Sequence, residues 1–365
     1  MKEAILKAVS GQDLSEQEME KVMNQIVSGH ATRAQVGAFI TALRLKGETE
    51  DEIVGAAKAI RSKTKKLRIR NGHLTLDRDE INIDEETILD TCGTGGEGTK
   101  TFSVSTATAF VVAGGGVKVA KYGHRPVSTR CGSADVLEAL GVNLEINTAS
   151  VEQCIQQLGI GFIYAPFFES PMRHAVSVRR DIGIKSIFNL LGPLVNPAAA
   201  NVQVLGVYSA DLTEKIARVL GRLGSREAFV VFGQSTLDEI SICGPTIISH
   251  LTKGCVSTFE IEPEQFGLQR AQPESIRGGN AEQNARIIRN VLEGERGPRR
   301  DVVLLNAAAA FMAAGLDNDF NSGLERARES IDSGRARDKL QSVISFTQQC
   351  GHFSRWEALE QGSSL

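Results

Sequence analysis

Residues 89–110, LDTCGTGGEGTKTFSVSTATAF, place four glycines within six positions and follow them with Thr99, Thr101, Ser103, Ser105 and Thr106. Glycines allow a ligand to approach the backbone N–H groups closely, and successive N–H groups ahead of a helix form an anion site. Hydroxyl groups can also donate to phosphate oxygens. The stretch therefore predicts a phosphate or pyrophosphate site, in preference to a simple capped turn.

Strands and helices alternate on both sides of this stretch. TILD (87–90) predicts a strand, residues 103–114 a helix, VKVAK (117–121) a strand and residues 133–140 a helix. Further strands are expected at 159–165, 202–208 and 227–232, β-rich runs within 238–262, and helices at 211–223, 281–293 and 301–314. Ser150 and Gln153 predict the start of another helix. This spacing favours a parallel sheet with ligands at the carboxyl ends of its strands.

Helices dominate the first 65 residues. Three capping-box pairs mark their expected starts: Ser15 with Glu18, Thr32 with Gln35, and Thr49 with Glu52. Gly29 and Gly47 stand where helices should end. The expected fold class is α/β, with a small N-terminal helical domain and a large α/β domain that has a mostly parallel central sheet. We place the helical domain at 1–70, with helices from about 170–190 packing onto it, the α/β domain at 85–355, and a linker at 66–86.

Composition narrows the class of protein. The 365 residues carry a net charge of −3, which argues against a general nucleic-acid binder. The chain has no apolar run of membrane-spanning length, and its N-terminus lacks the apolar core of a secretory signal. Its six cysteines form no C-x-x-C pair, so a reducing cytoplasm is the expected location.

A second polar segment, KYGHRPVSTRCGSAD (121–135), follows the second strand of the α/β pattern. Together with the glycine stretch, its cations and hydroxyls suit a ligand that is phosphorylated at both ends. The Walker pattern fails, because Thr99 follows Gly98 where lysine is needed. The spacing G-x-G-x-x-G is present, but the acidic residue expected about 20 positions later is missing, so a nicotinamide-dependent oxidoreductase is a remote alternative.

Two further segments carry charge. Asp238 and Glu239 follow the strand EAFVVF, and adjacent carboxylates at a strand end suit Mg²⁺. Residues 165–198 predict an amphipathic helix rich in arginine, followed by a rigid turn built on Gly192 and Pro193. Arginine is the usual partner of a planar carboxylate, although a solvated basic helix face would give the same composition.

Taken in order, these motifs resemble the anthranilate phosphoribosyltransferase family. They read CGTGGE (92–97), TFSVST (101–106), KYGHR (121–125), GSAD (132–135), APFFESP (165–171), SVR (177–179), NLLGPLVNP (189–197) and LDE (237–239). The resemblance implies transfer of the phosphoribosyl group of phosphoribosyl pyrophosphate (PRPP) to the amine of anthranilate, with Mg²⁺, in tryptophan biosynthesis. It also implies a homodimer that associates through the helical domains.

The resemblance assigns roles to individual residues. PRPP would be bound by Gly93, Thr94, Gly95, Gly96, Glu97, Thr101, Ser103, Ser105, Thr106, Lys121, Arg125, Ser128, Thr129 and Ser133. The acceptor would be bound by Gly93, Tyr122, His124, Glu169, Arg179, Gly192 and Pro193. Metal would be held by Ser105, Asp238 and Glu239, and Lys121 and Arg179 would be catalytic.

Six positions depart from the family pattern: Glu97, Ser103, Tyr122, His124, Glu169 and Phe232. Several of them surround the acceptor, which leaves open a paralogue that uses PRPP with a different arylamine or acceptor. A nucleoside-phosphorylase-like reaction also stays open, as does a non-catalytic relative that binds nucleic acid. Neither a nucleic-acid partner nor a membrane is expected.

Overall fold

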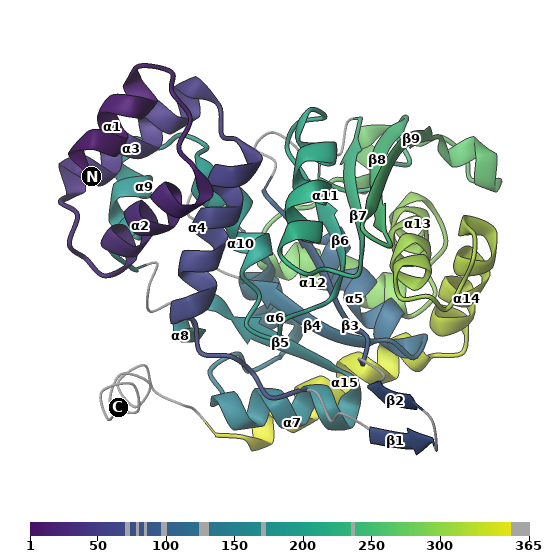
Figure 1. Cartoon of the computed structure of the whole chain (residues 1–365). Coiled ribbons are helices and arrows are strands. Elements are labelled where there is room, and N and C mark those ends of the chain that lie inside the picture. The colour runs from purple at the N-terminus through teal and green to yellow at the C-terminus, as the bar shows by residue number, and fades with distance from the viewer. Residues whose placement is uncertain are drawn as a thin grey trace.

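The computed structural model describes residues 1–69, 74–77, 80–83, 86–95, 101–123, 131–168, 173–234 and 238–351 (Figure 1). A bundle of N-terminal helices lies beside a larger body in which helices cover both faces of a sheet (Figure 1). Among these residues, every helix is too short or too polar to pass through a membrane.

Four helices form the N-terminal bundle: α1 (Lys2–Val9), α2 (Glu16–Val27), α3 (Arg33–Lys46) and α4 (Glu50–Lys63). All three predicted capping boxes are confirmed, at the starts of α2, α3 and α4. Gly47 follows the last residue of α3 with φ 89°, a backbone conformation that favours glycine. Helix α9 (Arg173–Ile182), although distant in sequence, packs against α2 and α3.

A seven-stranded sheet forms the centre of the larger body. In spatial order its strands are β5 (Ile160–Tyr164), β4 (Lys118–Gly123), β3 (Ile88–Gly93), β6 (Val202–Gly206), β7 (Glu227–Gly233), β8 (Thr246–Thr252) and β9 (Cys255–Ile261). The first five strands are parallel, and β8 and β9 continue the sheet in antiparallel fashion. The predicted fold class is therefore confirmed.

Helices connect the parallel strands, and further helices and short 3₁₀ turns follow β9. The helices are α5 (Val104–Gly114), α6 (Ser133–Leu140), α7 (Thr148–Leu158), α8 (Ala165–Phe168), α10 (Ile187–Leu194), α11 (Leu212–Arg222), α12 (Ala281–Leu292), α13 (Pro298–Ala313), α14 (Phe320–Asp332) and α15 (Arg335–Gln349). The 3₁₀ turns are η2 (Pro263–Phe266) and η3 (Pro273–Ile276).

The sheet separates two hydrophobic cores. One core joins the sheet to α5, α12, α13 and α14, and the other joins it to the N-terminal helices, α10 and α11. Strand side chains alternate between the two: Val119 of β4 belongs to the first core, and Ala120 and Tyr122 belong to the second. Because successive strand side chains point to opposite faces, Lys121 lies on the α5 face.

Two expectations about local structure are wrong. The expected linker at 66–86 contains an antiparallel hairpin, in which β1 (Leu74–Asp77) pairs with β2 (Glu80–Ile83). Alternating apolar residues on both sides of a polar turn are the hairpin pattern that the charge of this segment obscured. Helix α7 starts after Asn147, whose side chain accepts the Ser150 N–H at 2.8 Å, so Ser150 lies inside the helix.

The expected rigid turn at Gly192 and Pro193 is also wrong, because both residues lie inside helix α10. Ser186 is the N-cap of the helix, and its N–H donates to Asn189 Oδ1 at 3.1 Å. Pro193 is the penultimate residue of the helix. Near a helix end proline disturbs less of the helix than it does in the interior.

The helical bundle gives a first testable prediction, at the buried carboxylate of Glu52. Glu52 is 0% exposed and accepts from Leu14 N–H (2.9 Å), Thr49 N–H (2.8 Å) and Lys46 Nζ (3.0 Å). Glu52→Ala leaves these donors without their acceptor, so we expect it to reduce the free energy of unfolding by about 3 kcal/mol. Guanidinium unfolding measures this loss.

Glu50→Ala is the matched control, because Glu50 begins the same helix and pairs only at the surface, with Arg218 at 3.3 Å. We expect this control to cost less than about 1 kcal/mol. Equal losses in the two variants would show that Glu52 does not anchor the bundle.

Candidate active site

Glycines end four adjacent parallel strands: β4 at Gly123, β3 at Gly93, β6 at Gly206 and β7 at Gly233. Gly93 and Gly206 face each other in the β3–β6 register. A Cβ on Gly93 would lie 2.6 Å from Asp238 Oδ2, and one on Gly206 would lie 1.8 Å from the Asp238 carbonyl oxygen. The two glycines therefore let the segment with Asp238 cross the carboxyl edge of the sheet.

Lys121 brings a buried positive charge to this edge. Its side chain is on β4, the residue is 4% exposed, and Nζ donates to the Thr91 carbonyl oxygen and to Ser105 Oγ (3.1 Å for the latter). Thr91 Oγ1 in turn donates to the Ser105 carbonyl oxygen at 3.0 Å. These contacts connect β4, β3 and the first turn of α5.

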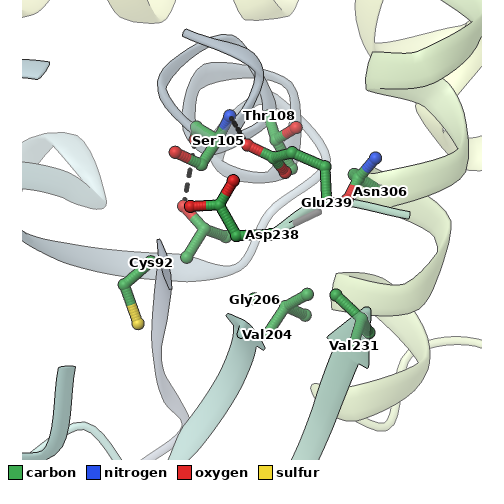
Figure 2. A pocket seen from close by; sticks show the side chains of 10 residues that line it. Cys92, Ser105, Thr108, Val204, Gly206, Val231, Asp238, Glu239 and Asn306 are labelled. Carbon is green, nitrogen blue, oxygen red and sulfur yellow. Dashed lines mark hydrogen bonds between the residues drawn. The ribbon is translucent and has the colours of Figure 1, made fainter. Parts of the chain in front are cut away.

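Two carboxylates face the same turn of α5. Ser105 N–H donates to Glu239 Oε1 at 3.2 Å (Figure 2). Gly95 N–H donates to Asp238 Oδ2 at 3.2 Å. The N-terminus of a helix stabilises negative charge. Even so, burial first and the charge of Asp238 second raise the pKa of Glu239, against the opposing effect of Lys121. The positive charge of Lys121 therefore does not balance the negative charge of the two carboxylates.

The donors at this place fit a Mg²⁺ ion. They are hard oxygen atoms of two carboxylates and of the Ser105 hydroxyl, and the buried Thr108 Oγ1, which lines the same pocket, has no hydrogen-bond partner among the described residues. In the part of the chain that the structure describes, His, Cys, Asp and Glu side chains form no group of three that could hold a metal. Mg²⁺ characteristically binds to one or two carboxylates and completes its shell with water and substrate phosphate.

The structure brings together many of the residues predicted to bind PRPP. The end of β3 is surrounded by Gly93, Thr94, Gly95, Ser105 and Lys121. Thr94 N–H donates to the Gly206 carbonyl oxygen at 2.9 Å. The hydroxyls of Thr94 and Thr106 are buried and have no hydrogen-bond partner among the described residues. They are thus polar groups that a ligand or water could satisfy.

Three more of the predicted PRPP residues lie close by. Ser103 occupies the N-cap of α5 without a side-chain capping bond. Ser133, the first residue of α6, faces the end of β4 so closely that a Cβ on Gly123 would lie 2.7 Å from its Oγ. Thr101 pairs with Arg277 in an isolated bridge. Gly96, Glu97, Arg125, Ser128 and Thr129 lie outside the described residues.

Of the predicted acceptor residues that the structure describes, Tyr122, Arg179, Gly192 and Pro193 belong to the opposite face of the sheet, and Gly93 ends β3 at its edge. Tyr122 is buried in the core shared with α10, and the Arg179 guanidinium of α9 lies 5.4 Å from the ring centre of Phe188 in α10. Phe188 and Gly192 are four residues apart and therefore share one face of that helix. Arg179 is thus placed beside the helix that carries Gly192 and Pro193. His124 and Glu169 lie outside the described residues.

Several residues of this edge were missed in the sequence. Asn196 Nδ2 donates to Asp90 Oδ2 (2.8 Å) and to the Ala120 carbonyl oxygen (2.9 Å), which ties the end of α10 to β3 and β4. Gly206 and Asn306 were also missed. Gly206 lies inside the strand predicted at 202–208, where a glycine indicates close approach of another backbone and could have identified it, whereas a buried asparagine carries no local signal.

Comparison with known proteins follows the same division of the chain. Residues 85–337 match the model of the glycosyl transferase family a/b domain, and residues 2–64 match its helical bundle domain. The chain is 53% identical to the anthranilate phosphoribosyltransferase of Geotalea uraniireducens (strain Rf4) over 349 residues, which cover 96% of this chain and 100% of the relative.

Solved structures give the same relationship. The anthranilate phosphoribosyltransferase of Thermus thermophilus matches with a TM-score of 0.85 at 39% identity, covering 94% of this chain and 99% of that one. The Saccharomyces cerevisiae protein in complex with PRPP and Mg matches with a TM-score of 0.83 at 30% identity, covering 95% and 97%.

Asp90 gives a prediction about pH. Burial raises the pKa of its carboxyl to about 6, against the charge of Lys121 and the hydrogen bonds from Asn196 and Tyr122 N–H. In the unfolded chain the pKa of an aspartate is about 3.9. The contribution of Asp90 to stability is therefore complete below that pH and is lost as the pH rises through about 6. Asp90→Asn does not titrate. We expect it to gain about 3 kcal/mol of unfolding free energy relative to the wild type between pH 4 and 7.

Paired denaturant unfolding curves across this range measure the difference. A constant difference between the two proteins would mean that Asp90 titrates alike in the folded and unfolded chains.

Proposed function

Since the chain belongs to the anthranilate phosphoribosyltransferase family, we propose that it transfers the phosphoribosyl group of PRPP to the amine nitrogen of anthranilate, in tryptophan biosynthesis. The amine lone pair attacks ribose C1, the bond from C1 to the pyrophosphate oxygen breaks, and pyrophosphate leaves with that electron pair. The new C1–N bond is completed by loss of one amine proton. The observation that supports this proposal most is the arrangement around Gly93: groups suited to phosphate and Mg²⁺ lie on the α5 face of the sheet, and Arg179 and α10 lie on the opposite face.

On the α5 face, Gly95, Ser105 and Lys121 would hold the pyrophosphate. The N-terminus of α5 and the ammonium group favour the negative charge that grows on the leaving oxygens. Asp238, Glu239 and the Ser105 hydroxyl would hold Mg²⁺, which when bound neutralises charge on the diphosphate. These groups act by position and charge, and an arylamine is already a free base near neutral pH.

On the opposite face, Arg179 would receive the acceptor carboxylate through its paired N–H donors. Phe188 supports the guanidinium at 5.4 Å, and Gly192 leaves the helix surface beside it without a side chain. With both substrates held, the amine is oriented toward C1, which lowers the entropic part of the barrier.

We also propose a homodimer that forms through the helical bundle. Leu6 and Val9 of α1 are each 68% exposed, and Leu45 of α3 is 84% exposed, while α1 and α3 pack together. An apolar surface of this kind marks an association site in soluble proteins. Sedimentation equilibrium tests the dimer. A cytoplasmic location is proposed from the six cysteines, all of which are free thiols.

The direct test follows the loss of anthranilate fluorescence in the presence of PRPP and Mg²⁺. We expect turnover to need all three components. Asp238→Asn should reduce kcat/KM by about 100-fold or more and shift activation to higher Mg²⁺, because a cation ligand is lost. Asp338→Asn, on the exposed surface of α15, is the control and should behave as the wild type.

PRPP binding without anthranilate turnover would instead indicate a different acceptor, which a series of arylamines would then identify. Absence of both binding and turnover would contradict the proposed function.

Adjacent arginines of α9 test the acceptor site. Arg179→Met should raise KM for anthranilate by about 10-fold or more and leave KM for PRPP unchanged, because it removes charged hydrogen bonds to one substrate only. Arg180 is exposed on the same helix, so Arg180→Met is the matched control. Equal effects of the two substitutions would place the acceptor elsewhere.

A further inference from the structure

Asp238 and Glu239 lie in an irregular segment between two strands. Strand β7 ends at Gly233 and β8 begins at Thr246, so the ladder of the sheet does not hold the two carboxylates. Loop segments without such support are more mobile than the elements they connect. A pair of carboxylates that must share one cation nevertheless needs a fixed position.

One side chain from a distant helix holds this segment. Asn306 of α13 accepts the Ile240 N–H at its Oδ1 (3.0 Å) and donates from Nδ2 to the Ile240 carbonyl oxygen (2.9 Å). Nδ2 also donates to the Val302 carbonyl oxygen of its own helix at 2.8 Å, and the residue is only 2% exposed. Both backbone groups of Ile240 are therefore bonded to a single amide.

The amide lies next to the carboxylates. Ile240 directly follows Glu239, and Figure 2 shows the Asn306 side chain beside Glu239 at the edge of the same pocket. From Ile240 the chain runs back through Glu239, which accepts Ser105 N–H, to Asp238, whose backbone crosses Gly206. The carboxylate pair is thus fixed on one side by Asn306 and on the opposite side by α5 and the strand glycines.

A single amide can serve both backbone groups of Ile240 and the Val302 carbonyl oxygen at the same time. Its oxygen accepts and its nitrogen donates twice, whereas a carboxylate cannot donate and an aliphatic side chain can do neither. Buried backbone groups without partners are unfavourable, so Ile240 would move to find new ones if the amide were removed. Movement of Ile240 would carry Glu239 away from the Ser105 N–H.

We propose that Asn306 is a positioning residue for the cation of the Mg²⁺–PRPP complex. It acts through Ile240 to hold Asp238 and Glu239 where the cation is received, and it does not itself touch the substrate. This inference rests on the proposed function. Partners of metal ligands contribute to affinity in this way, and their loss commonly weakens metal binding by about 10- to 100-fold.

The experiment measures Mn²⁺ binding by electron paramagnetic resonance in the presence of PRPP. The comparison is among the wild type, Asn306→Ala and Asn143→Ala. Asn143 is also buried and also binds backbone oxygens, of Thr347 (3.3 Å) and Gly351 (3.2 Å) at the end of α15. We expect both variants to have a lower Tm, and Asn306→Ala alone to bind Mn²⁺ about tenfold or more weakly.

The outcomes separate the two proposals. If the wild type does not bind Mn²⁺ with PRPP, the proposed function fails. If the wild type binds and Asn306→Ala binds equally well, or no more weakly than Asn143→Ala, Asn306 has only a structural role and the inference is overturned. If Asn306→Ala does not fold, Asn306→Ser, which keeps a small polar group at this position, replaces it in the same comparison.

Discussion

The buried ammonium of Lys121 is the interaction on which the site depends. A lysine that is only 4% exposed is unfavourable unless its charge is matched by hydrogen bonds and by nearby anions. The Thr91 carbonyl oxygen and Ser105 Oγ receive its protons, and the carboxylates of Asp90 and Glu239 lie close enough for its charge to lower their pKa values. The Lys121 ammonium thus connects two strands and the first turn of α5. Its single charge does not balance the negative charge of the carboxylates.

The alternation of side chains along a strand divides the site in two. Lys121 and Tyr122 are neighbours in β4, yet they point to opposite faces of the sheet. Groups suited to phosphate and metal gather with α5, and groups suited to an aromatic acid gather with α9 and α10. The two sets can meet beyond the carboxyl edge, at Gly93, where the absence of a side chain leaves room for Asp238. Under the proposed function, this arrangement would let one sheet bind two chemically different substrates.

The fold was predictable from the sequence, as was the gathering of several proposed PRPP residues at one edge of the sheet, because those signals are local. A capping box occupies four consecutive residues, and strand periodicity is read within one strand. The failures have equally physical causes. Asn147 and Ser150 both suit an N-cap, and only the hydrogen bond to Ser150 N–H decides between them. Gly192 and Pro193 are typical of a turn, but in α10 they occupy the last turn of a helix that packing stabilises.

Asn306 shows why the rest of the site could not be predicted. It lies 66 residues from Ile240 in the chain and acts on the backbone, so neither residue has a composition that suggests its partner. Its importance follows from a requirement of charge: Asp238 and Glu239 repel each other, and repulsion favours any displacement that separates them. A segment outside the strand ladder would yield to that force unless its backbone were bonded elsewhere. The carboxylates can remain together because Asn306 of helix α13 binds the backbone of Ile240, the residue that follows them.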